Sequence, residues 1–339
     1  MQCTNAADRL SQLYMACFGS APDTVTTITA AGSPRVYCRL SSAGRADYIG
    51  TVGTDRAENL AFRELSRHFA KAGLPVPRVI AASIDGMAYL QTDAGNRALF
   101  DLLGSPDAEP LLHKAMRMLA RIQTLGARGL DWSVCFPQPA FDERTVRFDL
   151  NYFKYCFLKV AGVAFDEMAL QDDFDRMERA LLDGAAEWNT FMYRDFQSRN
   201  VMVDDQGRLT AIDFQGGRRG PREYDLASFL WQAKARFAPD LRERLLDTYL
   251  DETASLDPTV DGTAIRRRLP LFVLFRVLQT LGAYGFRGLI ERRPHFLSSL
   301  KLGKMNLAAL FASNPEFAGA YPELKLISDN LTDSSDNAD

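Results

Sequence analysis

Two short strand-like segments inside a long helical region constrain this chain more than any other feature. "VMVDD" and "LTAIDF" are joined by the turn-forming "DQGR", a pattern that predicts an antiparallel hairpin. A hairpin closed by a short turn brings its two outer ends together. "YRDFQSRN", which contains Asp195 and Asn200, precedes the first strand, and Asp213 ends the second. We therefore expect these three side chains to lie close together.

Two carboxylates and one carboxamide that converge in this way offer hard oxygen ligands. Magnesium takes such ligands, keeps several waters, and completes its shell with the phosphate oxygens of a substrate. The pattern around Asp195 therefore favours a magnesium-dependent reaction of a phosphate compound.

The hydrophobic periodicity divides the chain into two parts. Residues 1–93 carry about five strand-like segments and one helix over residues 55–73, with Asp55 as the expected helix cap. After residue 93 the spacing is helical, and helices are predicted over 105–126, 144–162, 172–190, 222–237, 240–254, 262–290 and 300–312. The pattern predicts an α+β protein with a small β-rich lobe (1–93), a large helical lobe (94–328) and a disordered polar tail (329–339).

Composition narrows the possible partners. The 339 residues include 40 basic and 43 acidic side chains, a net charge of −3, so no basic surplus favours a nucleic acid. The most apolar stretch, "LPLFVLFRVLQTLGAYGF", is interrupted by Arg276 and is typical of a buried helix, so no membrane partner is expected. The N-terminus lacks a signal-peptide pattern and the five cysteines form no CxxC pair, which favours a reduced, cytoplasmic protein. We expect a monomer or a weak dimer.

The paired motifs resemble those of a known group of enzymes. "YRDFQSRN" and "AIDFQ" are similar to the catalytic loop and the Asp-Phe-Gly segment of protein-kinase-like enzymes, with Tyr193 in place of histidine and Gln215 in place of glycine. The closer resemblance, over residues of about 30 to 235, is to the aminoglycoside phosphotransferase family, which "NLAFRELSRHFAKAGLPVPRVIA" and "PREYDLASFLW" also resemble. Within that family the motifs look most like bacterial N-acetylmuramate/N-acetylglucosamine 1-kinases. The resemblance implies a protein-kinase-like, two-lobed fold that uses ATP and Mg²⁺.

The same resemblance implies roles for individual residues. Asp195 would be the catalytic base, and Asn200 and Asp213 would hold Mg²⁺. Arg194 and Arg199 are candidates for substrate binding. Asp149 lies on a predicted helix face that either lines the sugar pocket or packs in the core. The nucleotide site is expected at Gly32 and Ser33 in the first turn and at Gln91 and Asp93 where the lobes join.

One departure from the family pattern concerns the nucleotide phosphates. Kinase-like folds carry a lysine on the third strand, paired with a glutamate on the following helix, but "ADYIGTVGTD" has no lysine. Arg39 and Arg45 are the nearest cations, and Glu58 or Glu64 would be the helix glutamate. ATP binding would then depend on backbone amides and magnesium, or on an arginine that the pattern does not locate.

The expected function is an ATP-dependent sugar kinase. Residues 193–225 contain six arginines and six acidic residues, a balance that favours a neutral or anionic small molecule over a polycation. We expect phosphorylation of the anomeric hydroxyl of N-acetylmuramic acid or N-acetylglucosamine in cell-wall sugar recycling. The alternatives are an aminoglycoside- or choline-type phosphotransferase and a nucleotide-binding pseudokinase scaffold, the latter suggested by the missing lysine.

Overall fold

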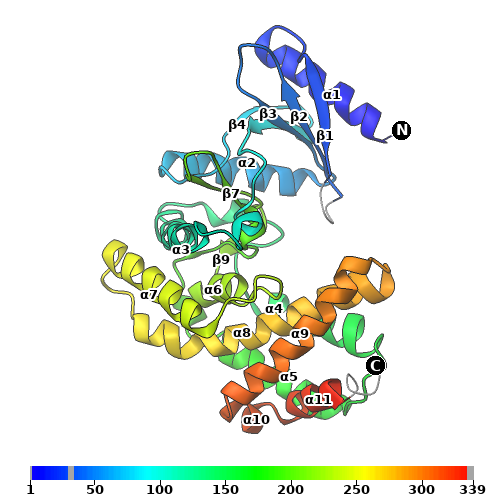
Figure 1. Cartoon of the computed structure of the whole chain (residues 1–339), viewed down its shortest axis with the longest axis vertical. Coiled ribbons are helices and arrows are strands. Elements are labelled where there is room, and N and C mark those ends of the chain that lie inside the picture. Colours follow the sequence, from blue (N-terminus) through cyan, green and yellow to red (C-terminus); the bar gives the residue numbers. More distant parts are fainter. Residues whose placement is uncertain (1, 30–33, 334–339) are drawn as a thin grey trace. The chain divides into compact units, whose positions relative to one another are not determined.

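The computed structural model describes residues 2–29 and 34–333 (Figure 1). Contacts divide the chain into two compact units. The first comprises Met1–Ala140, Thr190–Arg219 and Thr248–Pro258, and the second comprises Phe141–Asn189, Gly220–Asp247 and Thr259–Asp339. The first unit thus continues past residue 93, the predicted lobe boundary, and includes the embedded hairpin.

A five-stranded antiparallel sheet forms the N-terminal part of the first unit (Figure 1). Its strands follow the order β1 (Thr24–Ile28), β2 (Val36–Ser41), β3 (Tyr48–Val52), β5 (Ala88–Thr92) and β4 (Val79–Ala82). All five were predicted from β-branched and alternating segments, and short turns between neighbours in sequence favour the antiparallel pairing.

The two faces of this sheet carry different side chains. Helix α1 (Gln2–Phe18), which was not predicted from the sequence, covers one face, where Leu10 and Tyr14 pack with Leu40 and Leu90. Because side chains alternate along a strand, Arg39 and the odd-numbered residues of β5 face the opposite side.

Helix α2 (Arg56–Lys71) packs on that opposite face. Asp55 caps it as predicted, accepting hydrogen bonds from the backbone N–H groups of Ala57 (2.7 Å) and Glu58 (3.1 Å). One turn after Glu58, the ring of Phe62 stacks on Tyr89 of β5 with centroids 5.0 Å apart. Glu58 and Phe62 therefore share the helix face that is turned toward the sheet.

The embedded hairpin is also in the first unit. β7 (Val201–Val203) pairs antiparallel with β8 (Leu209–Ala211), which confirms the prediction. A second, unpredicted antiparallel pair joins the two-residue strands β6 (Phe191–Met192) and β9 (Arg218–Arg219). β6 precedes the loop that carries Asp195, and β9 follows the loop that carries Asp213. The remaining elements of this unit are the 3₁₀ turns η1 (Leu99–Leu102), η2 (Trp132–Val134) and η5 (Ser198–Asn200) and helix α3 (Ala108–Leu125).

The second unit is helical. It contains α4 (Glu143–Phe153), η3 (Lys154–Leu158), α5 (Glu167–Leu181), η4 (Ala185–Glu187), α6 (Arg222–Leu230), α8 (Gly262–Tyr284), η6 (Gly285–Ile290), α9 (Pro294–Ser313), α10 (Glu316–Ala320) and α11 (Pro322–Asp333). Helix α7 (Pro239–Leu256) has residues in both units.

The helical predictions differ from the structure mainly at element ends. Helix α6 ends at Leu230, before the predicted residue 237, and α5 begins and ends earlier than predicted. Helix α11 continues to Asp333, so residues 329–333 are helical where a disordered tail was expected, and residues 334–339 lie outside the described part. The apolar Leu324, Ile327 and Leu331 of α11 are buried, which explains why this polar-looking segment is helical.

Helix α8 is the central helix of the second unit. By length and composition, residues 262–290 could cross a membrane, and 56% of the most apolar window is buried inside the protein. Core helices have the same length and composition, and α8 packs against α4, α6 and α9. This packing agrees with the prediction of a buried helix.

Candidate functional site

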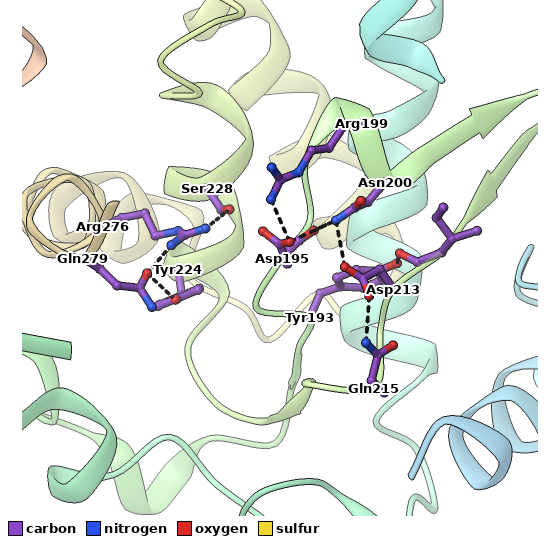
Figure 2. Close-up of polar contacts among 11 residues, drawn as sticks. Tyr193, Asp195, Arg199, Asn200, Asp213, Gln215, Tyr224, Ser228, Arg276 and Gln279 are labelled. Carbon is purple, nitrogen blue, oxygen red and sulfur yellow. Dashed lines mark hydrogen bonds and ion pairs between the residues drawn. The ribbon is translucent and has the colours of Figure 1, made fainter. Parts of the chain in front are cut away.

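The hairpin brings Asp195, Asn200 and Asp213 together, as the sequence predicted (Figure 2). The Asn200 Nδ2 atom donates to Asp195 Oδ2 at 3.1 Å and to the Asp195 backbone carbonyl at 2.9 Å, and it lies 3.5 Å from Asp213 Oδ2. The backbone N–H of Ile212 donates to the Asn200 carbonyl at 2.9 Å. This bond extends the β7–β8 ladder and places Asp213 opposite the end of the Asp195 loop.

The two loops that carry the carboxylates are held by buried aromatic rings. The Tyr193 hydroxyl donates to the carbonyl of Ile212, which ties the first loop to the second (Figure 2). Phe214 stacks on Phe62 of α2, with ring centroids 4.7 Å apart and an interplanar angle of 12°. Asp213 is thereby held against the first unit's sheet and helix by the residue that follows it.

Two non-glycine residues of these loops have a left-handed backbone. Arg194 has a φ of 76° and Asp213 a φ of 69°. Such conformations cost about 1–3 kcal/mol for a residue with a Cβ and persist only where the surroundings hold them. Their occurrence immediately before Asp195 and at Asp213 itself marks the site as a place where precise positioning outweighs local strain.

The carboxyl group of Asp213 is in an unfavourable environment for its charge. Burial raises its pKa, and the negative charge of Asp195 raises it further. A hydrogen bond from Gln215 Nε2 to Asp213 Oδ1 (2.7 Å) and the positive charges of Arg35 and Arg199 act in the opposite direction. A cation at this position would relieve the repulsion between the two carboxylates.

The carboxylate of Asp195 is more accessible. Its side chain is 31% exposed, and Oδ2 accepts from the Arg199 guanidinium at 3.1 Å. Arg199 is 58% exposed, so this ion pair adds little to stability but leaves a positive charge beside the carboxylate. The half-buried Arg194 precedes Asp195 directly.

Arg35 is a buried cation that was not among the residues predicted from the sequence. The guanidinium of Arg35, only 3% exposed, forms an ion pair of 2.9 Å with Glu58 on the first turn of α2. Burial opposes its charge, but Tyr89, Tyr37 and Glu58 together raise the pKa of the guanidinium. The positive charge of Arg35 also acts on Asp213, where it partly offsets the rise in the pKa of that carboxyl group. Arg35 and Glu58 therefore form a largely buried arginine–glutamate pair between the start of β2 and the first turn of α2.

The cations proposed from the sequence are in different places. Arg39 forms an ion pair with Asp93 and also donates to the Gly95 carbonyl at 3.4 Å. The Arg45 guanidinium lies 4.6 Å from the ring centroid of Phe18 in α1, on the face of the sheet away from α2. Glu64 pairs with Arg67 on its own helix. A local signal for Arg35 existed, because it is the first residue of the strand-like segment "RVYCRL", but its partner could not be deduced from the strand pattern.

The residues predicted to contact the nucleotide are described in part. Gln91 is on β5, and its Oε1 atom is buried with no hydrogen-bond partner among the described residues, so it is an available acceptor. Asp93 already accepts from the Arg39 guanidinium (3.1 Å) and the Gly95 N–H (2.8 Å). Gly32 and Ser33 lie outside the described residues.

Asp149, the remaining candidate for substrate binding, belongs to the second unit. It is 3% exposed, and its Oδ2 accepts from Gln279 Nε2 at 2.8 Å. Gln279 Oε1 in turn accepts from the Tyr224 hydroxyl at 2.9 Å (Figure 2). Asp149 is thus part of a buried polar network, which corresponds to the core-packing alternative, and it is not among the residues that the first unit brings together.

The Asp213 carboxylate and the carboxamides of Asn200 and Gln215 beside it are side-chain types that fit a magnesium ion. Within residues 2–29 and 34–333, no group of three His, Cys, Asp or Glu side chains is arranged to hold a metal. A divalent cation here would depend on the Asp213 carboxylate, carboxamide oxygens and the phosphates of a nucleotide. Magnesium is commonly bound with one or two protein carboxylates in this way, whereas a structural zinc ion is coordinated by four protein side chains.

The chain is similar in sequence to a known enzyme family and to kinases of known name. The model of the phosphotransferase enzyme family (APH) matches residues 24–259. An N-acetylmuramate/N-acetylglucosamine kinase of Pseudomonas putida is 23% identical over 312 residues, covering 91% of this chain and 87% of the relative. A kinase of the same name from Neisseria meningitidis is 26% identical over 264 residues, covering 72% and 76%.

Solved structures show the same fold. An amicoumacin kinase in complex with AMP-PNP, Ca²⁺ and Ami aligns with a TM-score of 0.62 and 14% identity, covering 84% of this chain and 88% of that one. The GDP complex of aminoglycoside 2'-phosphotransferase-IIIa aligns with a TM-score of 0.58 and 14% identity, covering 88% and 98%. These neighbours confirm the predicted protein-kinase-like α+β fold. The family model matches most of the chain, over residues 24–259. The chain therefore belongs to the phosphotransferase enzyme family and transfers a phosphoryl group to a hydroxyl acceptor.

Proposed function

We propose that this enzyme is an ATP-dependent sugar kinase that phosphorylates the anomeric hydroxyl of N-acetylmuramic acid or N-acetylglucosamine. The observation that carries the proposal is the convergence of Asp195, Asn200 and Asp213 at the ends of one hairpin. The names of the relatives from Pseudomonas putida and Neisseria meningitidis support the sugar. The reaction would serve cell-wall sugar recycling in the cytoplasm.

Asp195 would accept or orient the proton of the sugar hydroxyl. Asn200 and Arg199 both contact its Oδ2 atom, which fixes the orientation of the carboxylate. An anomeric hydroxyl is more acidic than other sugar hydroxyls, so a carboxylate is a sufficient base for a loose phosphoryl-transfer transition state.

Asp213 and Asn200 would hold Mg²⁺ together with the nucleotide phosphates. When bound, the ion neutralises charge that develops on the transferring phosphoryl group. Arg35, oriented by Glu58, would supply the positive charge that other kinase-like enzymes take from a lysine. An intact arginine–glutamate pair beside Asp213 favours an active enzyme over a pseudokinase scaffold.

The charge near Asp195 supports a neutral or anionic acceptor. Arg199 lies against the carboxylate and Arg194 precedes it, which would repel a polycationic aminoglycoside and suits an N-acetyl sugar or a sugar acid. Gln91 and Asp93 are proposed to line the nucleotide site, where the buried Gln91 Oε1 could accept a hydrogen bond from the nucleotide. A substrate role for Asp149 remains a prediction.

The test is a panel of acceptors with ATP and Mg²⁺, followed by phosphorus NMR of the product. Coupling of the phosphorus to the anomeric proton is the expected result. The methyl glycoside of the same sugar lacks the reactive hydroxyl and should be inert while competing weakly. A 6-phosphate product, or rapid turnover of kanamycin without sugar activity, would contradict the proposal.

A further inference from the structure

Gln215 stands directly after "IDF", at the position where protein-kinase-like enzymes carry a glycine. Its side chain is buried, with 9% exposed, and its Nε2 atom donates to Asp213 Oδ1 at 2.7 Å (Figure 2). Its Oε1 atom is buried and has no hydrogen-bond partner among the described residues. An unpartnered buried acceptor costs about 1–3 kcal/mol, so its presence beside a candidate metal ligand calls for a physical explanation.

The carboxylate of Asp213 has one carboxamide at each of its oxygens. Gln215 Nε2 faces Oδ1 at 2.7 Å, and Asn200 Nδ2 faces Oδ2 at 3.5 Å (Figure 2). Both amides present their nitrogen, the only part of a carboxamide that can favour a buried negative charge. A half-turn of the terminal torsion exchanges the nitrogen with an oxygen of similar size, and such sp³–sp² torsions have broad minima.

The separation between Gln215 and Asp213 suits two ligands of one ion. Oxygens bound to octahedral magnesium at about 2.0–2.1 Å and at right angles are about 2.9 Å apart. The observed 2.7 Å between Gln215 Nε2 and Asp213 Oδ1 is close to this edge, whereas the 3.5 Å between Asn200 and Asp213 is longer. The described residues also lack a third acidic ligand, so a further carboxamide oxygen would complete the donor set.

We propose that Gln215 is a third metal-holding side chain. Without a cation, its Nε2 compensates the charge of Asp213; with the nucleotide and a divalent cation present, its carboxamide turns and Oε1 becomes a ligand. The buried Gln215 Oε1 atom, which has no hydrogen-bond partner among the described residues, would then have the cation as its partner. This inference rests on the proposed function, because it requires that the site binds a metal–nucleotide complex.

The experiment measures metal binding directly and needs no turnover. Free Mn²⁺ is titrated by electron paramagnetic resonance against the full chain with AMP-PNP, using the parent, Gln215→Met and Gln215→Glu. Gln215→Met removes both amide atoms at similar length, whereas Gln215→Glu removes the N–H donor and keeps an oxygen. The control is Gln206→Met, the same change at an exposed glutamine of the β7–β8 turn. Circular dichroism without metal checks that each variant is folded.

The expected result is a loss of about tenfold to a hundredfold in Mn²⁺ affinity for Gln215→Met, with Gln215→Glu and Gln206→Met as tight as the parent or tighter. Unchanged affinity in Gln215→Met would overturn the inference. A loss in Gln215→Glu equal to that in Gln215→Met would also overturn it, because the N–H donor would then be the important group. If the parent itself bound no Mn²⁺ with AMP-PNP, both the inference and the proposed function would fail, an outcome distinct from the other two.

Discussion

Replacement of Arg35 by methionine tests whether this protein is an active kinase or only a nucleotide-binding scaffold. The Arg35 side chain is 3% exposed and pairs with Glu58 at 2.9 Å. Its positive charge acts on Asp213, where it opposes the rise in the pKa of that carboxyl group. Loss of one preorganised charged donor to a transition state costs about 10²–10³ in kcat, equivalent to about 2.7–4 kcal/mol. Because Arg35 is desolvated, we expect kcat/KM for ATP to fall by that amount.

The same substitution also has a structural cost that must be measured separately. Removing one partner of a fully buried ion pair costs about 3–5 kcal/mol, but Glu58 remains 25% exposed and water can solvate it. The expected loss of unfolding free energy is therefore nearer to about 1–3 kcal/mol. The double variant Arg35→Met/Glu58→Gln removes the leftover charge, so it should recover stability without recovering kcat/KM. Chemical denaturation and steady-state kinetics distinguish the two effects.

Arg39→Met is the matched control, since Arg39 is the next cation along the chain, within β2, and it forms an ion pair with Asp93. Its effect on ATP should stay below tenfold, or about 1.4 kcal/mol, and the same limit holds for Arg45→Ala. Arg35→Lys keeps the charge but not the planar fork, so its activity should lie between those of the parent and Arg35→Met. If folded Arg35→Met kept kcat/KM for ATP within tenfold of the parent, the role assigned to Arg35 would be wrong.

Three further predictions concern the hairpin loops. Asp195→Asn should lower kcat by about 10²–10⁴ and leave nucleotide affinity, measured by calorimetry, almost unchanged; equal turnover would exclude a role as base. Asp213→Asn should abolish turnover yet raise the melting temperature of the metal-free protein at neutral pH. The raised pKa of Asp213 means that the folded state disfavours its charge, so this gain should shrink as the pH falls toward about 4, and a lower melting temperature at pH 7 would contradict it. Gly217→Ala would place a Cβ 2.1 Å from Phe191 Cζ and should destabilise the fold by about 1–3 kcal/mol in denaturation, whereas Gly216→Ala, with nothing nearer than 3.8 Å, should not.

The sequence determined the hairpin and the residues at its ends. Strand pairing across a short turn is a local event, so the spacing of Asp195, Asn200 and Asp213 was enough to predict that they meet. The five strands of the sheet and the cap at Asp55 were predictable for the same reason, since alternation and capping depend on residues only a few positions apart.

Tertiary structure decided which charges act together. Arg35 and Glu58 are brought together by the packing of α2 on the sheet, a long-range contact that no local pattern encodes, and the same packing leaves Arg39 with Asp93 and Arg45 over Phe18. Helix α1 and the last turn of α11 exist because apolar side chains find buried partners, which overrides their ordinary propensity. The orphaned oxygen of Gln215 likewise depends on burial, because an exposed glutamine at the same position in the sequence would be satisfied by water.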